Sequence, residues 1–314
     1  MTNDVCNALS ELGHKAEPVA IYDDPMKFIA SLVDFGPDLA FNLVESVYNN
    51  SAYEMNIPGL LELLKIPYTG SPSIALGLCV EKGKAKELLA SRGIPTPGFF
   101  TARSTSDLGK LNIDFPLFVK PLHEDGSLGI SADSVVSDRD GLYEIVEKLS
   151  ARYGSVLIEK YIDGRELNVS ILGNNPPKVL PVSEIDYSQM PSGSPKVLTY
   201  NAKWINHSEE YIGSKPLCPA CISDKTKLLL ERYVLDVFEL FSLKDYGRVD
   251  FRMDKSGNVY VIDINPNPCI SVESGFIRSA GVAGYSFTET IGKIIDSSME
   301  KSDIFVGNEV NTQN

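Results

Sequence analysis

The chain has 314 residues, of which 43% are hydrophobic and 9% aromatic, so it can form a buried core in two or three packed subdomains. Its 42 acidic residues outnumber 29 basic ones, and the net charge of −13 argues against nucleic-acid binding and against an anionic membrane surface. We find no apolar run of transmembrane length and no signal peptide, and five irregularly spaced cysteines indicate a reduced, cytoplasmic protein.

The first 75 residues alternate between helical and strand-like patterns. We predict helices at residues 3–12, 25–33 and 55–64, and strands at residues 19–22, 38–44 and 67–70. This alternation predicts a small parallel sheet with helices on its faces. Because such a unit normally begins with a strand and the pattern here begins with a helix, we expect a sheet that lacks its first strand.

The next region begins with a predicted helix at residues 80–91. A short buried strand follows at residues 115–121 (FPLFVKP) and ends in Lys120, just before a flexible Gly/Ser loop that contains Ser127. A phosphate group fits this combination, because the loop can present N–H and hydroxyl groups while the lysine supplies a positive charge. Taken alone, Lys120 is equally well explained as a lysine at a strand end whose stem lies along apolar surface.

A helix is predicted at residues 141–151, followed by two strands at residues 156–162 and 166–172. The Asp-Gly pair between the strands is a turn signal, so we expect these two strands to pair as a hairpin.

Three polar residues of this region have two interpretations each. Glu159 could accept a hydrogen bond from the amino group of a purine, and Glu166 could bind ribose hydroxyls, but a polar strand face with cross-strand pairs explains both more simply. Lys203 lies in a long polar segment, residues 183–211, of a kind that is usually functional or disordered. It could reach a γ-phosphate, although a solvated lysine is the simpler interpretation.

The strongest signal follows a predicted amphipathic helix at residues 226–241. Residues 247–254 (GRVDFRMD) and 259–265 (VYVIDIN) are two strand-like runs around the turn signal KSGN. Successive side chains of a strand point to opposite faces, so within each strand two polar residues share a face. These pairs are Arg248 with Asp250, and Asp263 with Asn265.

An antiparallel hairpin would gather these polar side chains at one end. Two carboxylates and an amide oxygen are hard ligands that suit Mg²⁺ bound to phosphate oxygens. A surface hairpin with solvated acids fits less well, because the apolar residues of 259–264 mark a buried strand, in which an acid needs a partner.

Other motifs carry little weight. The CPAC sequence at residues 218–221 is a lone C-x-x-C without a second cysteine pair, so a zinc site or a redox motif is not supported. Neither G-x-S-x-G nor a Walker phosphate-binding loop occurs.

Taken in order, these segments resemble the ATP-grasp ligases, and most closely the D-alanine–D-alanine ligase family. The likeness covers nearly all of the chain after about residue 38. It is carried by GLLELLKIPYTGS at 59–71, EK at 81–82 with Lys86, the strands at 115–121 and 156–172, YNAK at 200–203, CPA at 218–220 and the hairpin at 248–268.

The resemblance implies an ATP-grasp fold of the α/β and α+β class. An N-terminal parallel-sheet subdomain (1–75) would carry substrate, and two subdomains (76–160 and 161–314) would grip ATP between them. It also implies ATP and two Mg²⁺ ions as cofactors, with Mn²⁺ as a substitute. The substrates would be amino acids that serve as carboxylate and amine, and a homodimer is suggested by the same likeness.

The resemblance further implies a role for each matching residue. The ATP-binding residues would be Lys82, Lys120, Ser127 and Lys203 at the phosphates, Phe118, Glu159, Lys160, Tyr161, Ile162 and Ile262 at the adenine ring, and Glu166 at the ribose. The metal ligands would be Asp250, Asp263 and Asn265. The catalytic residues would be Arg248, at the acyl phosphate and the tetrahedral intermediate, and Lys203. Ser274 would contact the carboxylate of the second substrate, near Arg248.

The chain departs from the family pattern mainly on the amino-acid side. The strand and Gly-rich loop that hold the first D-alanine are not recognisable, and residues 45–54 (ESVYNNSAYE) replace the family's His-Gly and Gly-Glu-Asp-Gly turn. The tyrosine after the loop lysine is Trp204, which cannot accept a hydrogen bond. Further departures are Gly126-Ser127 in place of a double serine, Asp263 in place of a metal glutamate, and Pro268-Cys269 in place of Pro-Gly.

The sequence therefore predicts an ATP-dependent carboxylate–amine ligase that forms a peptide bond through an acyl phosphate. Two alternatives remain open. One is a ligase for a different amino-acid pair in a specialised pathway, and the other is an ATP-binding homologue without ligase activity.

Overall fold

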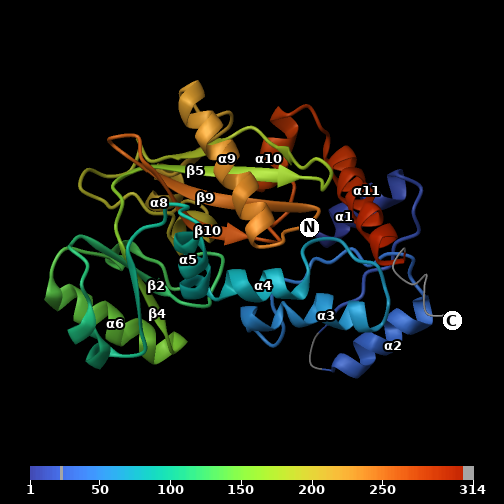
Figure 1. Ribbon diagram of the computed structural model, residues 1–314, viewed down its shortest axis with the longest axis horizontal. Helices are drawn as coiled ribbons and strands as arrows, with labels where there is room; N and C mark the ends of the chain where they lie inside the picture. Colours follow the sequence, from blue (N-terminus) through green and yellow to red (C-terminus); the bar gives the residue numbers. More distant parts are fainter. Residues whose placement is uncertain (22–23, 307–314) are drawn as a thin grey trace.

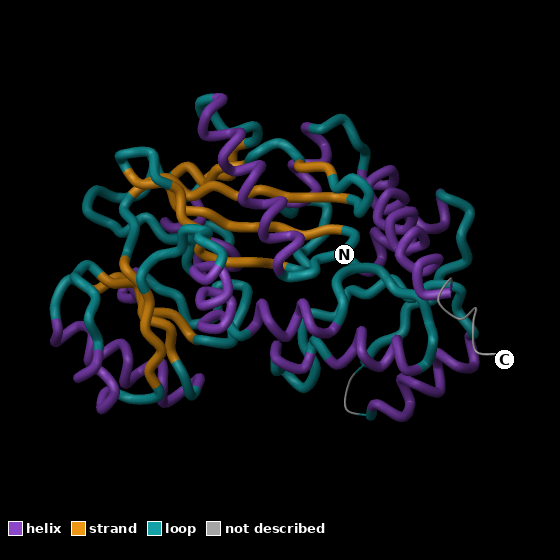
Figure 2. The backbone as a smooth tube through the Cα atoms, in the orientation of Figure 1, coloured by secondary structure: helices purple, strands orange, loops and turns teal. Residues whose placement is uncertain are grey.

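The structure, a computed structural model, describes the backbone of residues 1–21 and 24–306, with side chains up to residue 300 (Figure 1). It contains two antiparallel sheets, one of four strands and one of six, with helices packed around them (Figure 2). This mixture of helices and sheets agrees with the predicted α/β and α+β fold. Within the described ranges, no helix is long and apolar enough to cross a membrane.

Three of the predicted helices form in the N-terminal part: α1 (Thr2–Glu11), α2 (Pro25–Phe35) and α3 (Asn56–Leu63). Helix α2 begins after Asp24, whose carboxylate accepts hydrogen bonds from the N–H groups of Met26 and Lys27. Helix α1 packs against the last helix, α11 (Phe287–Val306) (Figure 1).

The predicted parallel sheet of the N-terminal part is wrong. Residues 19–21 form no strand, and Tyr22, the last residue of that predicted strand, lies outside the described residues. Residues 38–44 and 67–70 meet only at one parallel bridge, between Ala40 and Tyr68. Side chains explain why the ladder stops there: the N–H of Asn42 donates to Thr69 Oγ1 (2.9 Å) and the N–H of Val44 to Asn42 Oδ1 (3.1 Å).

The four-stranded sheet has the order β1-β4-β2-β3 and lies at lower left in Figure 1. Its strands are β1 (Phe99–Ala102), β2 (Leu117–Pro121), β3 (Val135–Val136) and β4 (Val156–Lys160). Helix α6 (Arg139–Tyr153) covers one face, to which it contributes Leu142, Val146 and Leu149. Strand β2 and helix α6 were both predicted.

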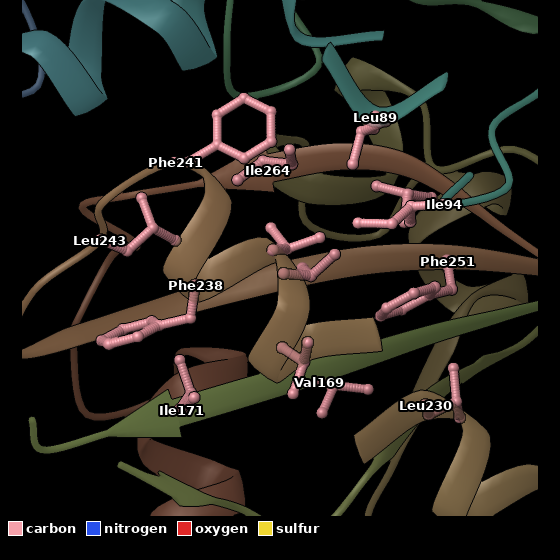
Figure 3. Packing of buried hydrophobic residues seen from close by; sticks show 14 of the residues in the cluster. Leu89, Ile94, Val169, Ile171, Leu230, Phe238, Phe241, Leu243, Phe251 and Ile264 are labelled. Atoms are coloured by element: carbon pink, nitrogen blue, oxygen red, sulfur yellow. The ribbon is translucent and has the colours of Figure 1, made fainter. Parts of the chain in front are cut away.

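The six-stranded sheet has the order β10-β9-β5-β7-β8, with β6 paired to β5. The strands are β5 (Gly164–Leu172), β6 (Lys178–Val179), β7 (Ser183–Asp186), β8 (Lys215–Leu217), β9 (Tyr246–Asp254) and β10 (Val259–Asn265). Helix α9 (Asp224–Leu240) lies across one face, where Val169, Phe251 and Phe238 pack in the largest core of the molecule (Figure 3). Burial of that apolar face leaves the opposite face of the sheet free to carry polar side chains.

The predicted hairpin of residues 156–162 with 166–172 is also wrong. Strand β4 pairs with β1 and β2, whereas β5 belongs to the other sheet and pairs with β9, β7 and β6. The glycine of the apparent turn signal, Gly164, is required for a different reason. A Cβ atom on Gly164 would lie 1.9 Å from the carbonyl oxygen of Met253 in β9, so this position admits only glycine.

The remaining helices connect or cover the sheets. The predicted helix at residues 80–91 is α5 (Lys82–Ser91), and α4 (Ser73–Val80) precedes it without having been predicted. The long polar segment contains β7 and two short helices, α7 (Tyr200–Trp204) and α8 (Glu209–Gly213). Helix α10 (Gly275–Val282) follows β10, and short 3₁₀ helices occur at Ser51–Tyr53, Thr105–Lys110 and Ala132–Ser134.

Candidate active site

A cleft of about 970 Å³ lies between the two sheets and is lined by residues of both. It brings together every residue that the sequence analysis placed at a site, except Lys82. Lys82 lines an adjoining cavity of about 60 Å³ under the loop of residues 124–130, which we call the glycine loop. Lys120, Lys203, Arg248, Asp263 and Asn265 line both spaces.

A β-bulge at Ile262 places the acidic residues of β10 in the cleft. Val261 pairs with Phe251, but Asp263 pairs with Asp250, so β10 holds one extra residue there. Strict alternation would put Asp263 on the same face as Val261, which is buried in the core. The bulge turns Asp263 and Asn265 to the cleft side, where they face Asp250 and Arg248.

Asp250 is held by donors from two neighbouring strands. Arg248 makes a bidentate contact with it, with Nε donating to Oδ1 (2.7 Å) and an Nη to Oδ2 (2.8 Å). Asn168 Nδ2, on β5, donates to Oδ1 at 2.8 Å, and Asn265 Nδ2 donates to Oδ2 at 3.2 Å. Asn168 was not predicted, although its position directly opposite Asp250 follows once β5 is known to pair with β9.

Asp263 is surrounded by positive charge. Four cationic side chains act on it: those of Lys82, Lys120, Lys203 and Arg248. Burial alone would raise the pKa of Asp263, but these charges outweigh burial and hold the pKa below its usual value. The Asp263 carboxylate is therefore ionised, and it accepts no hydrogen bond from the described residues, so its oxygens can bind a ligand.

The metal ligands proposed from the sequence are two carboxylates and one amide, gathered on one face of the hairpin. No group of three His, Cys, Asp or Glu side chains with metal-site geometry exists in the described ranges. A site here therefore depends on Asp250, Asp263 and Asn265 together with oxygens of a bound phosphate. Oxygen donors of this kind fit Mg²⁺, which usually takes only one or two protein carboxylates beside phosphate.

A buried ion-pair cluster joins the two sheets at the cleft floor. Glu159 on β4 contacts Lys86 of α5, and its other oxygen lies 3.3 Å from Lys120 Nζ. Lys120 Nζ also donates to the carbonyl of Ile262 at 3.1 Å. Burial would raise the pKa of Glu159, but Lys120 and Lys86 outweigh it and lower the pKa. Lys86 entered the sequence analysis only through the resemblance, and its place beside Glu159 was not predicted.

The end of the cleft where the resemblance implies an adenine ring contains Phe118, Ile262 and the segment 160–162. The N–H groups of Lys160 and Tyr161 donate to Gly98 (2.8 Å) and Pro116 (3.1 Å), whereas that of Ile162 has no backbone partner among the described residues. The Lys160 side chain is turned away from this end, because its Nζ donates to the carbonyl of Phe115 at 2.7 Å.

Glu166 is oriented by two residues that the sequence did not point to. Tyr187 donates its hydroxyl to Glu166 Oε2 (2.7 Å), and Arg252 lies 3.6 Å from the same oxygen. The Arg252 guanidinium also lies over the rings of Tyr161 and Tyr187, 5.5 and 6.0 Å from their centroids. One carboxylate oxygen of Glu166 is thus occupied by protein, and the other is available in the cleft.

Lys203 and Ser127 both line the cleft. Burial lowers the pKa of Lys203, and the nearby positive charge of Arg248 adds to this effect. Lys82 is anchored in the glycine loop, where its Nζ donates to the carbonyl of Glu124 and to Asp125 Oδ1, both at 2.8 Å.

The far end of the cleft combines acidic and basic groups. Ser274 caps helix α10 by accepting a hydrogen bond from the N–H of Ile277 (3.3 Å), and Arg278 of the same helix also lines the cleft. Glu45 and Glu54 face this end from the N-terminal part. Neither glutamate was assigned a role from the sequence, where both stood only as departures from the family pattern.

Glu54 is the more buried of these two glutamates. Its Oε1 accepts a hydrogen bond from Asn267 Nδ2 (2.9 Å), and Asn267 in turn accepts one from the Tyr246 hydroxyl. Burial raises the pKa of Glu54 to about 8; the Asn267 hydrogen bond opposes the rise, and the charges of Asp125 and Glu45 add to it. Glu54 is therefore largely protonated at neutral pH in the free protein.

We expect Glu54→Gln to stabilise the protein at high pH. The unfolded carboxyl ionises near pH 4.5, so the wild type loses stability as pH rises from about 4.5 through about 8, and the full cost persists above that range. The pKa shift of Glu54 sets an upper limit of about 5 kcal/mol on the loss of unfolding free energy. For a half-buried side chain we expect a loss of about 2 kcal/mol. Urea unfolding should show the gain at pH 8.5 and little difference at pH 5. Glu17→Gln, on an exposed residue, is the control, and an equal gain at both pH values would contradict the assignment.

The fold and the cleft together define a class of protein. Two antiparallel sheets that enclose a cleft lined by lysines and carboxylates form the ATP-grasp architecture. A family model described as the D-ala D-ala ligase C-terminus matches residues 88–296. The chain belongs to the D-alanine–D-alanine ligase family, and this membership supports an ATP-binding ligase.

Individual relatives agree with the family match. An Aquifex aeolicus protein named D-alanine–D-alanine ligase is 31% identical, over 93% of this chain and 92% of its own length. A Sinorhizobium fredii protein, named uncharacterized protein y4sG, is 32% identical over 94% of this chain and 86% of its own. The crystal structure of D-alanine–D-alanine ligase from Bacillus anthracis superposes with a TM-score of 0.78 at 26% identity, and covers 96% of this chain and 92% of that one.

Proposed function

We propose that this protein is an ATP-dependent ligase that joins a carboxylate to an amine through an acyl phosphate. The observation that carries the proposal is the position of Asp263. Its ionised carboxylate, with oxygens open to the cleft, lies among four cations and opposite Asp250. This arrangement suits a divalent cation bound to the terminal phosphates of a nucleotide.

The nucleotide would extend along the cleft. Phe118 and Ile262 would enclose the adenine ring, Ile162 N–H would meet its edge, and Glu166 would bind the ribose through its available oxygen. Lys82 and Lys120 would hold the phosphates, with Ser127 in the loop above them. Glu159, which resemblance places at the adenine amino group, would also fix Lys120 through their ion pair.

The reaction would proceed in two displacements. A substrate carboxylate oxygen attacks the γ-phosphorus and ADP departs, while Lys120 and Lys203 compensate the charge on the transferring oxygens. The amine then attacks the acyl carbon, loses a proton and expels phosphate, and Arg248 stabilises the oxyanion. Asp250, Asp263 and Asn265 would hold two Mg²⁺ ions, or Mn²⁺, whose positive charge neutralises the phosphates.

The far end of the cleft favours amino-acid substrates. Ser274 and the positive charge of Arg278 suit a carboxylate, and Glu45 with Glu54 suits an ammonium group, whose charge would favour the ionised form of Glu54. Because these two glutamates come from the segment that departs from the family pattern, a pair other than two D-alanines is a second candidate. A cytoplasmic location, expected from the cysteine pattern, and a homodimer, suggested by the resemblance, belong to the same proposal.

A phosphate-release screen with Mg²⁺, ATP and single or paired amino acids tests the proposal. Release with D-alanine alone would support a D-alanine–D-alanine ligase, and release that needs another pair would support the second candidate. Detection of the dipeptide by mass spectrometry is required in either case. Tight ATP binding without release in any combination would overturn ligase activity and leave a nucleotide-binding homologue.

A further inference from the structure

Glu54 is held at the cleft by a chain of hydrogen bonds that begins in the core. The Tyr246 hydroxyl donates to Asn267 Oδ1, and Tyr246 itself is fully buried, with its ring packed edge-on against Phe276. Asn267 Nδ2 donates in turn to Glu54 Oε1 (2.9 Å) and to the carbonyl of Val44 (3.1 Å). Asn267 therefore fixes a cleft-lining carboxyl group of the N-terminal part against the segment that follows β10.

The direction of each bond in this chain follows from the groups that make it. An amide nitrogen can only donate and a carbonyl oxygen can only accept, so Asn267 presents Nδ2 to Val44 and Oδ1 to Tyr246. Glu54 Oε1 is therefore an acceptor in both the ionised and the protonated carboxyl. Since Oε2 accepts no hydrogen bond from the described residues, a proton taken up by Glu54 resides on Oε2.

Glu54 belongs to the part of the cleft where an acyl phosphate would form. The buried Cys79 thiol also lines the cleft. Burial raises the pKa of this thiol, and the negative charges of Asp263 and Glu54 both add to the rise. The same thiol therefore lies near the carboxylate that we assign to the metal and near Glu54.

The surroundings of Glu54 favour uptake of a proton. Burial raises the pKa of Glu54 to about 8, and the negative charges of Asp125 and Glu45 add to the rise, while the hydrogen bond from Asn267 opposes it. The Tyr246 hydroxyl and the Cys79 thiol also face Glu54, and burial raises the pKa of both, so neither is charged at neutral pH. Glu54 is thus a stronger base than an ordinary carboxylate.

Other acidic residues of the cleft are less suited to accept a proton. Cationic side chains lie beside the carboxylates of Asp125, Glu159, Glu166, Asp250 and Asp263. Burial also raises the pKa of Glu45, but Glu45 accepts no hydrogen bond from the described residues that would orient it. Glu54 combines a raised pKa with a fixed orientation.

We propose that Glu54 takes a proton from the attacking amine, and that Asn267 is a positioning residue that leaves Glu54 Oε2 open to the substrate. This inference rests on the proposed ligase function. An ammonium group has no lone pair and cannot attack an acyl carbon. It would pair with the ionised carboxylate, transfer one proton to Oε2 and attack as the neutral amine. Phosphate then leaves with the electron pair of its bond to carbon and takes the second proton of the nitrogen.

The first test separates proton transfer from formation of the acyl phosphate. Hydroxylamine is neutral at neutral pH and converts an acyl phosphate to a hydroxamate without needing a base. The probes are Mg²⁺, ATP and D-alanine, or the amino-acid pair that the screen identifies. We expect Glu54→Gln to lower dipeptide formation about 10²-fold, while hydroxamate formation stays at the wild-type rate. An equal fall in both products, or wild-type dipeptide formation, would overturn the role as proton acceptor and leave the proposed function intact.

The pH dependence of the rate tests Asn267. Dipeptide formation should fall as the pH drops through the pKa of Glu54, because the base must be ionised. The Asn267 hydrogen bond lowers that pKa, so in Asn267→Ala the pKa rises and the fall should begin about one pH unit higher. A residue that only supports the fold would lower the Tm and change the rate by the same factor at every pH, and this result would overturn positioning.

Asn174→Ala is the matched control for Asn267→Ala. Asn174 Nδ2 also donates to a carboxylate and to a carbonyl, Asp245 Oδ1 (2.9 Å) and Ser297 O (2.8 Å). None of these three residues lines the cleft. We expect this variant to lose stability without any shift of the pH profile.

A ligand-free measurement decides the positioning even if no amino-acid pair gives product, a result that would overturn the proposed function and the catalytic role of Glu54 together. Carboxyl-carbon NMR identifies the Glu54 resonance by its absence from Glu54→Gln. We expect it to titrate near pH 8 in the wild type and in Asn174→Ala, and at higher pH in Asn267→Ala. Identical titrations in all three proteins would overturn positioning by Asn267.

Discussion

Replacing Asp263 by asparagine is expected to abolish Mg²⁺-dependent ATP turnover, with a loss of at least about 10³-fold. Asparagine keeps the size of the side chain and removes the negative charge that we propose holds the metal. Four cations act on this position, so the substitution also leaves them with less compensation. Binding of ATP without Mg²⁺ should therefore persist or become tighter, while the dependence of affinity on Mg²⁺ disappears.

The measurement is phosphate release with the substrate pair found in the screen, together with calorimetric ATP titrations with and without Mg²⁺. Asp236→Asn, on an exposed carboxylate of α9, removes the same charge outside the cleft. It should leave the rate of phosphate release and the Mg²⁺ dependence of ATP affinity unchanged. Turnover near the wild-type rate in Asp263→Asn would rule out this side chain as a metal ligand.

Replacing Arg248 by lysine is expected to reduce amide formation by about 10²- to 10³-fold, while ATP affinity changes little. Lysine keeps the charge but cannot make the bidentate contact with Asp250, at 2.7 and 2.8 Å. The charge would then no longer be fixed where the oxyanion forms. The variant should also release phosphate without an equal amount of dipeptide, because an acyl phosphate that is not captured by the amine is hydrolysed.

Arg165→Lys provides a matched control for this experiment. Arg165 makes the same kind of fork with Glu184, at 2.6 Å for both bonds, on the same sheet, and neither residue lines the cleft. We expect Arg165→Lys to lower the free energy of unfolding by at most about 1 kcal/mol and to leave catalysis unchanged. A wild-type ratio of dipeptide to phosphate in Arg248→Lys would contradict the proposed role.

The core of the site could be predicted from the sequence because it lies on one local hairpin. Two short strands and a turn fixed the pairing of β9 with β10, and alternation grouped the polar residues within each strand. The bulge was not predicted. Its signal is visible in retrospect in Val261-Ile262-Asp263, where two adjacent apolar residues interrupt the alternation.

Contacts between distant segments could not be predicted in this way. The Asp-Gly pair at the start of β5 signals a local turn, but Gly164 is needed for the close approach of β9, which lies about 90 residues later. Similarly, the apolar run at residues 38–44 indicates a strand, but the side chains of Asn42 and Thr69 take the N–H groups that a parallel ladder would use.

Residues that act through others were the hardest to find. Arg252 and Tyr187 orient Glu166, and Asn168 contacts Asp250 from the neighbouring strand. None of the three belongs to a recognisable motif, and each becomes visible only through the register of β5 with β7 and β9.

The extra residue in β10 also determines which changes of length this strand can tolerate. Deleting Ile262 would restore regular pairing with Asp263 still opposite Asp250 and Ile264 still opposite Val249, so both residues would keep their faces of the sheet. Loss of one residue after the bulge, such as Ile264, would instead turn Asn265 into the apolar interior. Natural variants of this chain should therefore tolerate loss of Ile262 better than loss of a single residue after it.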